Sequence, residues 1–307
     1  MTLTELRYIV AVAREKHFGR AAEACFVSQP TLSVSIKKLE EELDVRIFER
    51  GANEVSMTPL GEEIVRQAQS VIEQAAGIRE IAKRKKDPLT GALRLGVIYT
   101  IGPYLLPDLV RQAIERVPQM PLMLQENFTA KLLDMLRTGE LDCAIMAEPF
   151  PDTGLAIAKL YDEPFMVALP ATHPLAKRKS ISAEELKEEK MLLLGTGHCF
   201  RDHVLEVCPE YARFSSEAEG MRKTFEGSSL ETIKYMVASG MGITVVPQLS
   251  VPAEAQAHVV YVPFTKPVPT RRVVLAWRRS FTRYEAIAAL RNAIYACPLK
   301  GVKRLTD

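Results

Sequence analysis

The chain of 307 residues is long enough for two or three domains. It is 47% hydrophobic and 25% charged, which is ordinary for a water-soluble protein, and no apolar run approaches the roughly 18 residues that a membrane span requires. The net charge of +2 favours no particular class of partner.

The N-terminus has no basic segment followed by an apolar core, so the sequence predicts a cytoplasmic protein without a secretory signal. In that compartment thiols are kept reduced, and a disulfide is typically transient or regulatory. The five cysteines, at 25, 143, 199, 208 and 297, form no C-x-x-C pair. We therefore expect neither a metal site nor a cofactor.

The first sixty residues predict three helices and then a β-hairpin. An apolar stripe at positions 3, 6, 9, 10 and 13 predicts the first helix, and the small residues of 18–25 predict a second that another helix can cross closely. Ser28 is a good N-cap for a third helix, and Pro30 falls in its first turn, where the missing N–H costs nothing. Positions 32, 36, 39 and 43 form its buried side.

The rest of the third helix is polar or basic, with no acid before Glu40. Such a helix front suits the major groove of DNA. Net charge gives no such hint, because the first sixty residues hold eight Lys and Arg against nine Asp and Glu. We expect Pro30 on the DNA-binding surface, beside four polar residues that approach bases: Gln29, Thr31, Ser33 and Ser35. We expect Lys37, Lys38 and Arg50 to contact phosphate or the minor groove.

Residues 46–58 predict two short strands around a turn, the wing of a winged helix-turn-helix, with Arg50 placed to approach phosphate or the minor groove. A generic small helical bundle is the alternative. The order of the elements and the S-Q-P-T-L-S run at 28–33 favour the winged motif.

This run, the F-x-x-A-A motif at 18–22 and the F-x-R motif at 48–50 resemble the N-terminal motif of LysR-type transcriptional regulators. The resemblance extends over the whole length of the chain. It implies a transcriptional regulator that is not an enzyme, with double-stranded DNA and RNA polymerase as partners.

A long helix is predicted to start at Thr58, an N-cap followed by a first-turn proline. Its apolar residues at 60, 64, 68, 71, 75, 78 and 82 recur near every 3.5 positions, which is typical of a coiled-coil seam. We favour dimerisation through this helix over a helix that packs only on its own domain. The basic cluster at 83–86 and the Asp87-Pro88 pair predict a hinge.

From Gly91 onward, strands alternate with helices, which predicts an α/β domain. Two such lobes with chain crossovers resemble the periplasmic-binding-protein architecture of LysR effector domains. We expect a winged helix-turn-helix at 1–58, a linker helix and hinge at 59–88, and a regulatory domain at 89–307. Within the last, lobe I takes about 91–163 and 268–300, and lobe II about 164–267. Strands are expected at 93–100, 122–128, 142–147, 165–169, 191–194, 242–246 and 273–277, and helices at 103–116, 131–138, 183–187, 199–208, 229–238 and 284–296.

Cys199 and Cys208 lie at opposite ends of one predicted helix that Pro209 would end. If so, they are about 13.5 Å apart along the axis and half a turn apart around it. A disulfide needs Cα atoms within about 7 Å. The two thiols can bond only if the helix unwinds, which is the physics of a redox switch. Two ordinary core cysteines are the alternative.

Local chemistry favours reactivity at Cys199, because helix N-termini and nearby cations stabilise a thiolate. His198 and Arg201 lie beside it. Thr100 and Thr129 follow two predicted strands, at the sheet edge where α/β folds bind ligands, although a helix N-cap would also explain each.

The run G-H-C-x-R-D at 197–202, followed by Cys208, further resembles the sensing element of the hydrogen-peroxide-responsive members of the LysR family. That resemblance implies that Cys199 reacts with peroxide, that Cys208 resolves it to a disulfide, and that oxidation activates transcription in a homodimer or homotetramer. Thr100, Thr129, His198 and Asp202 would hold the peroxide. The chain departs from these relatives at Gly195-Thr196 and in a longer stretch at 209–220.

Two other functions stay open at this point. A LysR-type regulator could respond to a small organic effector, with inert cysteines. An enzyme, either a thiol peroxidase or a cysteine hydrolase, could use Cys199 with His198. Neighbouring side chains on a helix point about 100° apart, however, so His198 is poorly placed as a base.

Overall fold

The computed structural model describes residues 1–50, 55–83, 89–151, 154–211, 224–227, 229–254 and 256–305. The predicted turn of the wing, the basic residues 84–86, the hinge at 87–88 and most of the long stretch at 209–220 lie outside these residues, as do the side chains of Arg50 and Ala82. No helix within the described ranges combines the length and hydrophobicity needed to cross a bilayer.

Three helices form the N-terminal domain: α1 (Leu3–Glu15), α2 (Phe18–Ala24) and α3 (Gln29–Leu43). The Ser28 hydroxyl accepts a hydrogen bond from the Thr31 amide, which confirms Ser28 as the N-cap of α3. Three of the four predicted core positions of α3 are buried in the domain core, at 32, 36 and 39. Leu43 is 37% exposed, so its predicted burial is wrong. It is the last residue of α3, and the chain turns away at Asp44 in a left-handed conformation.

The predicted wing is present as β1 (Phe48–Arg50) paired antiparallel with β2 (Val55–Met57). The Glu40 carboxylate accepts hydrogen bonds from the amides of Ile47 (2.7 Å) and Phe48 (3.1 Å). The first acid after the front of α3 therefore ties the helix to the wing. A Cβ at Gly61 would lie 2.2 Å from the Ile47 carbonyl oxygen, so the wing and the next helix can meet only at a glycine.

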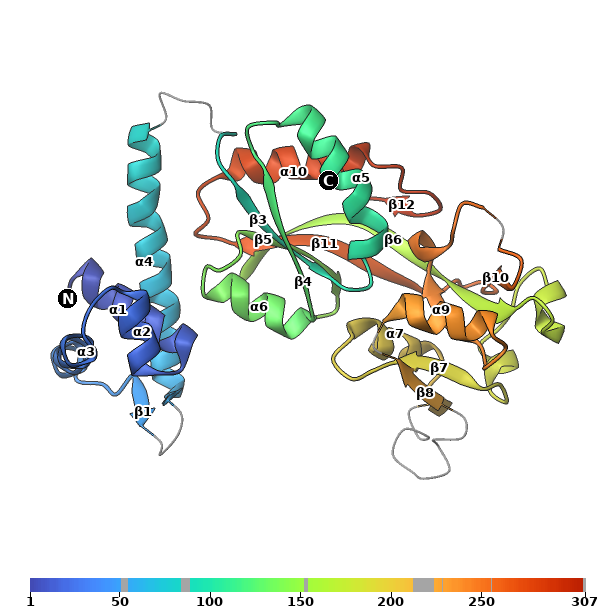
Figure 1. Cartoon of the computed structure of the whole chain (residues 1–307), viewed down its shortest axis with the longest axis horizontal. Coiled ribbons are helices and arrows are strands. Elements are labelled where there is room, and N and C mark those ends of the chain that lie inside the picture. The colour runs from blue at the N-terminus through green and yellow to red at the C-terminus, as the bar shows by residue number, and fades with distance from the viewer. Residues whose placement is uncertain are drawn as a thin grey trace.

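The long helix α4 (Pro59–Lys83) rises from this domain (Figure 1). Ile64, Ala68 and Val71 from the predicted seam pack into the N-terminal core, beside α1. Farther along the same seam, Ile78 is 68% exposed. Three residues of the seam are thus used within the domain, whereas Ile78 remains open to a partner.

The C-terminal region is built on a mixed eight-stranded sheet in the part of the chain that the structure describes, with β3, β4 and β5 parallel to one another. Helices α5 (Gly102–Arg116) and α10 (Tyr284–Ala296) pack side by side on one face, and α6 (Thr129–Arg137) covers the other (Figure 1). The strands are β3 (Leu93–Ile98), β4 (Leu122–Asn127), β5 (Cys143–Glu148), β6 (Leu155–Pro170), β9 (Thr244–Pro247), β10 (Val259–Pro263), β11 (Thr270–Arg278) and β12 (Lys303–Arg304).

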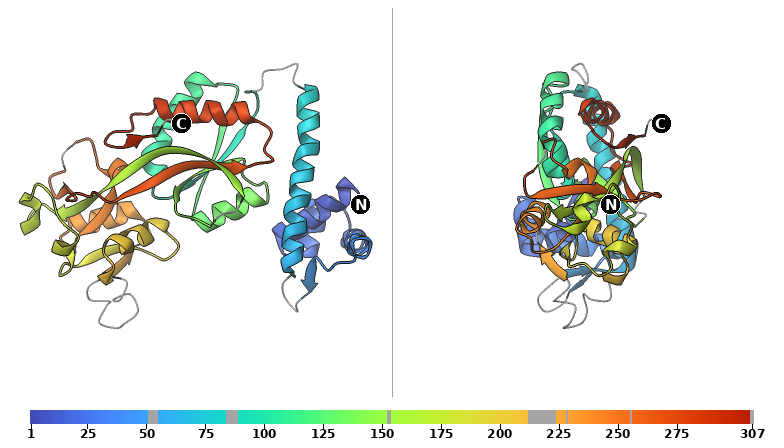
Figure 2. Two further views of the ribbon diagram at one scale, coloured as in Figure 1. Left: turned by 180° about the vertical axis from the view of Figure 1, so that it is seen from behind. Right: turned by 90° about the vertical axis from the view of Figure 1, so that its right-hand side faces the viewer.

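Two lobes share this sheet through the long strand β6 (Figure 2). Residues of 93–161 and 273–299 form the buried core of lobe I, and residues of 165–264 form that of lobe II. Lobe II adds the parallel pair β7 (Met191–Leu194) and β8 (Thr224–Gly227), with α7 (Cys199–Val207) and α9 (Leu230–Ala238). The Tyr104 hydroxyl on α5 donates to the Glu231 carboxylate on α9 (2.6 Å), which joins the lobes.

The predicted α/β fold of two lobes behind a winged helix-turn-helix and a long helix is confirmed. One further local expectation is wrong, and one predicted strand is present but longer than expected. The predicted helix at 183–187 is a single 3₁₀ turn (Glu184–Leu186), because three residues are too few for an α-helix. The predicted strand at 165–169 is only the end of the 16-residue β6.

Candidate functional site

Helix α7 separates two free thiols, as expected from the sequence. Cys199 is its first residue, and Cys208 is its C-cap. At 1.5 Å per residue, nine steps place them about 13.5 Å apart along the axis. Cys199 is half-buried and packs against the core of lobe I, whereas Cys208 is fully buried in the core of lobe II. The two sulfur atoms therefore lie in different apolar clusters.

A small cavity adjoins Cys199 at the carboxyl ends of two neighbouring parallel strands. Its volume is about 10 Å³, which is room for about one water-sized molecule. Because Ile98 of β3 pairs with Asn127 of β4, the residues that follow these strands come together at one edge. The cavity is lined by Ile98, Tyr99, Thr100, Asn127, Phe128, Thr129, Gly197, His198 and Cys199.

Three aromatic rings gather at this cavity. Phe128 contacts the His198 ring edge-to-face with centroids 4.8 Å apart, and Tyr99 contacts both (5.2 Å to Phe128, 5.8 Å to His198). Gly197 has a positive φ of 99°, and a Cβ there would lie 3.3 Å from the Phe128 ring. Glycine at 197 thus lets the chain turn into α7 directly beneath these rings.

A buried arginine hydrogen-bonds to Thr100. The Arg271 guanidinium donates to the Thr100 hydroxyl (2.7 Å) and to the Thr100 carbonyl (3.0 Å). The positive charge of Arg271 is balanced by Glu163, whose Oε2 lies 2.8 Å from Arg271 Nη2. Both side chains of this ion pair are fully buried. Because the Thr100 oxygen accepts from Arg271, its own O–H is left to donate elsewhere.

The other predicted pocket residues are placed differently. Thr129 Oγ1 is buried and has no hydrogen-bond partner among the described residues. His198 is the buried N-cap residue of α7. Asp202 is exposed and does not line the cavity, so the structure does not bring it to the other four. It lies in the first turn of α7.

The Cys208 thiol stays protonated in this state. Burial, with a smaller contribution from Glu210, raises the pKa of Cys208 to about 12, so the thiol keeps its proton at neutral pH. Arg201, expected beside Cys199, donates to the Leu194 carbonyl (3.0 Å) and ties the start of α7 to the end of β7. Burial also raises the pKa of Cys297 to about 11, in keeping with a packing role.

Sequence reasoning missed Arg271 and the aromatic rings at the cavity. Arg271 finds its partners 108 and 171 residues away, and no local spacing predicts such contacts. Tyr99 and Phe128 adjoin the two predicted threonines. Their signal was present in the sequence, as aromatic residues at the ends of two strands.

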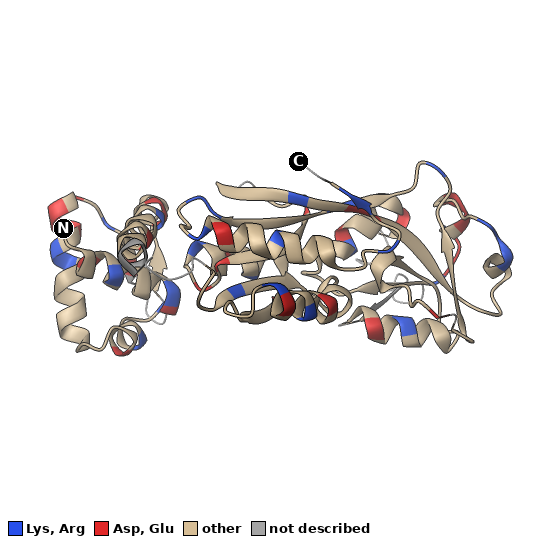
Figure 3. Ribbon diagram, turned by 90° about the horizontal axis from the view of Figure 1, so that it is seen from above, with Lys and Arg blue, Asp and Glu red and all other residues tan. Residues whose placement is uncertain are grey.

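The exposed front of α3 is a candidate DNA interface. Gln29, Pro30 and Thr31 are exposed there, with Lys37 and Lys38 farther along, whereas Ser33 and Ser35 are half-buried at its flanks. Sequence reasoning missed Val34, which is 69% exposed. It lies four residues after Pro30 and four before Lys38, so it occupies the centre of the exposed face. Figure 3 shows basic and acidic residues interspersed along the chain, in keeping with its small net charge.

Gly195, one of the two departures noted above, has room for a side chain. Its amide donates to the Gly227 carbonyl (2.9 Å), and a Cβ would meet only that oxygen, at 3.7 Å. The backbone at this position therefore does not require glycine.

Comparison with known proteins places these features in a family. The model of the bacterial regulatory helix-turn-helix protein, lysR family, matches residues 3–62, and that of the LysR substrate binding domain matches 86–296. The DNA-binding transcriptional dual regulator OxyR of Escherichia coli is 39% identical over 292 residues, which is 94% of each chain.

Solved structures of OxyR proteins are also similar to this chain. Full-length OxyR C199D from Pseudomonas aeruginosa is 51% identical, with a TM-score of 0.82 over 100% of this chain and 98% of its own. A hydrogen-peroxide-bound cysteine-to-serine mutant of Corynebacterium glutamicum OxyR is 33% identical, with a TM-score of 0.62 over 95% of this chain and 91% of its own.

Proposed function

Because the chain belongs to the LysR family of bacterial transcriptional regulators, we propose that it is a DNA-binding regulator switched by hydrogen peroxide. One observation carries the proposal: an intact helix holds a cavity-lining thiol and a buried thiol about 13.5 Å apart along its axis. The relatives named as OxyR, including a peroxide-bound structure, support the choice of signal.

The first step is oxidation of Cys199. Its thiolate attacks one oxygen of hydrogen peroxide, an S–O bond forms and the O–O bond breaks. The departing hydroxide takes a proton and leaves as water, and Cys199 becomes a sulfenic acid. Thr100 donates its O–H to the peroxide, and the unpartnered Thr129 hydroxyl supplies a second polar contact. His198 encloses the cavity with its aromatic neighbours.

The second step closes the disulfide. The Cys208 thiolate attacks the sulfenic sulfur, the S–S bond forms, and the S–O bond breaks with release of a second water. The intact helix forbids this step, since a disulfide needs Cα atoms within about 7 Å. Cys208 also needs to leave its apolar cluster before it can lose its proton. Unwinding of α7 satisfies both requirements and remodels lobe II.

The size of the cavity argues against the alternative of an organic effector at this site. A volume of about 10 Å³ holds about one water-sized molecule, which is far too little for an organic anion. A dedicated peroxidase would not require the winged helix-turn-helix and linker helix that occupy the first 83 residues. We therefore propose a cytoplasmic regulator rather than an enzyme.

The DNA-binding surface of the proposal is the exposed front of α3. Gln29, Thr31 and Val34 approach base edges from its centre, with Pro30, Ser33 and Ser35 beside them, and Lys37 and Lys38 contact phosphate. The wing brings Arg50 to the phosphates or minor groove. A dimer formed through α4 reads two inverted half-sites, and pairing of regulatory domains gives the tetramer that presents the complex to RNA polymerase.

Cysteine variants of the full-length protein test the proposal. After addition of one equivalent of peroxide, the wild type should lose two thiols and change its binding to a selected operator. Cys199→Ser should lose both responses. Cys208→Ser should still form a sulfenic acid, trapped by dimedone, but no disulfide. A wild type whose thiols stay free while peroxide changes operator binding would sink the proposal.

A further inference from the structure

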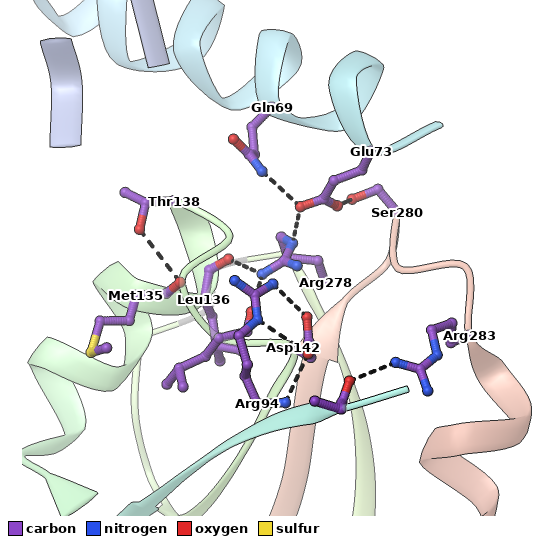
Figure 4. Close-up of polar contacts among 12 residues, drawn as sticks. Gln69, Glu73, Arg94, Met135, Leu136, Thr138, Asp142, Arg278, Ser280 and Arg283 are labelled. Atoms are coloured by element: carbon purple, nitrogen blue, oxygen red, sulfur yellow. Dashed lines mark hydrogen bonds and ion pairs between the residues drawn. The ribbon is translucent and has the colours of Figure 1, made fainter. Parts of the chain in front are cut away.

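Among the described residues, a carboxylate of the linker helix α4 lies against lobe I with polar groups around it from both sides (Figure 4). Glu73 on α4 accepts from Gln69 Nε2 (2.8 Å) on the same helix and from Ser280 Oγ (2.5 Å) on lobe I. The Arg278 guanidinium lies 2.5 Å from the same carboxylate. We call these four residues the α4 clasp.

The lobe I side of the clasp is firmly anchored. Arg278 is the last residue of β11, and its guanidinium donates to the carbonyls of Leu136 and Leu141 (Figure 4). The side chains of Arg278 and Glu73 are only 9% and 15% exposed. Loss of one partner from such a pair leaves an uncompensated charge in a poorly hydrated place.

The clasp takes the place of a shared apolar core. The described core of lobe I includes no residue of α4, whereas five apolar residues of α4 belong to the N-terminal cluster: Ile64, Val65, Ala68, Val71 and Ile72. A cavity of about 430 Å³, lined by both partners, lies beside the clasp. Gly77 allows close approach, since a Cβ there would lie 2.9 Å from the Thr282 methyl. A polar contact next to open space can rearrange more easily than a packed core.

One strand connects the clasp with the thiol site. Near the start of β11, Arg271 holds Thr100 and lies 5.1 Å from the ring of Phe200, the second residue of α7. At its end, Arg278 holds Glu73. Seven residues at about 3.3 Å each separate the two arginines by about 23 Å. Strand β5 pairs with Arg272–Trp277 on one side of β11, and β6 pairs along its whole length on the other, with a register shift between Val273 and Val274. These pairings hold most of the strand between the two arginines within the sheet.

We propose that Glu73 is a positioning residue, which fixes the angle of α4 on lobe I and lets β11 couple the redox state of Cys199 to the DNA-binding domain. The inference rests on the proposed function. Unwinding of α7 removes Phe200 from the Arg271 guanidinium. The resulting shift of β11 moves Arg278, and the clasp transmits the movement to α4.

The variant Glu73→Gln in the full-length protein tests this role, because it keeps the size of the side chain and removes its charge. Its matched control is Glu184→Gln, the same replacement, which breaks an exposed ion pair in lobe II. Two quantities are measured with and without peroxide: the amount of Cys199–Cys208 disulfide and the affinity for a selected operator. Coupling between sites is typically 5–150-fold. We expect Glu73→Gln to form the disulfide at the wild-type rate, while its ratio of oxidised to reduced affinity approaches one.

The outcomes separate this inference from the proposed function. A wild type that shows no redox-dependent affinity contradicts the proposed function. A responsive wild type matched by an equally responsive Glu73→Gln overturns the clasp alone. If Glu73→Gln fails to fold in a thermal unfolding check, Ser280→Ala decides, since it removes one donor and keeps the ion pair. It should reduce the ratio partly, and an unchanged ratio again overturns the inference.

Discussion

At the scale of single residues, the two thiols differ in what surrounds them. Cys199 lines a cavity beside two hydroxyl groups, whereas Cys208 is sealed among apolar side chains of lobe II. The first is placed to meet a small oxidant. The second is protected by protonation and burial until the helix that carries it opens.

The buried state of Cys208 predicts a pH dependence of stability. Its pKa is raised from 9.0 to about 12 in the folded state, so the folded chain binds its proton more tightly than the unfolded chain. The resulting stabilisation is complete below pH 9 and is lost as pH rises through this window. Relative to Cys208→Ser, the free energy of unfolding of reduced protein should fall by up to about 1.4 kcal/mol per pH unit above 9. Urea unfolding of both proteins at pH 8, 9 and 10 measures these free energies. If the difference in free energy between wild type and Cys208→Ser does not change with pH, the raised pKa of Cys208 is refuted.

Val34 predicts a base preference. An exposed apolar side chain at the centre of α3 suits the C5 methyl group of thymine. Replacement of the contacted thymine by uracil removes one methyl group, worth about 0.8 kcal/mol, and should weaken wild-type binding about fourfold. Val34→Ala keeps only one methyl group and should show a smaller uracil effect than the wild type, whereas Lys38→Ala should weaken binding to both operators and lower its salt dependence. A Val34→Ala protein whose sensitivity to uracil equals that of the wild type excludes this contact.

The residues that sequence reasoning found share a local signal. Ser28 and Pro30 mark a helix start, and Cys199 and Cys208 bracket one helix, so spacing alone relates them. Arg271 could not be found in this way, because its role comes from Glu163 and Thr100, which only the folded sheet brings near. Asp202 lies three residues after Cys199, so helical spacing puts the two on one face of α7. Its side chain is nevertheless exposed and outside the cavity, because the cavity walls come from residues 98–100 and 127–129 of lobe I and from 197–199.

At the scale of elements, the start of α7 depends on Gly197. A side chain there would require a left-handed backbone and would press on Phe128. Gly197→Ala should cost about 1–3 kcal/mol of stability. We expect it to slow sulfenic acid formation at Cys199 by roughly tenfold, since small displacements at reacting groups have effects up to about 100-fold. Stopped-flow oxidation and urea unfolding measure the two effects.

Gly195→Ala is the matched control for this experiment. Its Cβ meets only one oxygen at 3.7 Å, and no left-handed backbone is required there. It should oxidise at nearly the wild-type rate. Equal rates for Gly197→Ala and wild type would show that the turn before α7 does not position Cys199.

Helices with a regular apolar pattern were predictable from the sequence. Strands that depend on pairing with distant strands were not. Helix α10 has the bounds expected from its apolar pattern, and α4 follows from its cap and its seam. The first half of β6 escaped detection because its pairing with β11 joins segments more than a hundred residues apart. Strand β10 escaped detection too, since it pairs with the far end of β6, and its partners lie 89 to 97 residues away in the sequence.

At the scale of the whole molecule, the exposed end of α4 predicts the assembly. Ile78 is 68% exposed on the side that the seam leaves free. A charge in that contact would be buried without a partner, so Ile78→Glu should dissociate the dimer at micromolar concentration and weaken operator binding. Ala76→Glu, at an exposed position about 200° around the helix from Ile78, is the control and should remain dimeric. Analytical ultracentrifugation decides, and an unchanged dimer for Ile78→Glu would place the interface elsewhere.

The central claim is that oxidation joins two thiols that an intact α7 keeps apart. Hydrogen–deuterium exchange across α7, measured with disulfide quantification by mass spectrometry on the same sample, tests it most directly. In reduced protein the helical amides should be protected, including that of Cys208, which donates to the Val204 carbonyl at 2.9 Å. We predict that this protection is lost in proportion to the Cys199–Cys208 disulfide that peroxide produces, and returns with reductant. A disulfide that forms while these amides stay protected, or a loss of protection while both thiols remain free, would contradict the account.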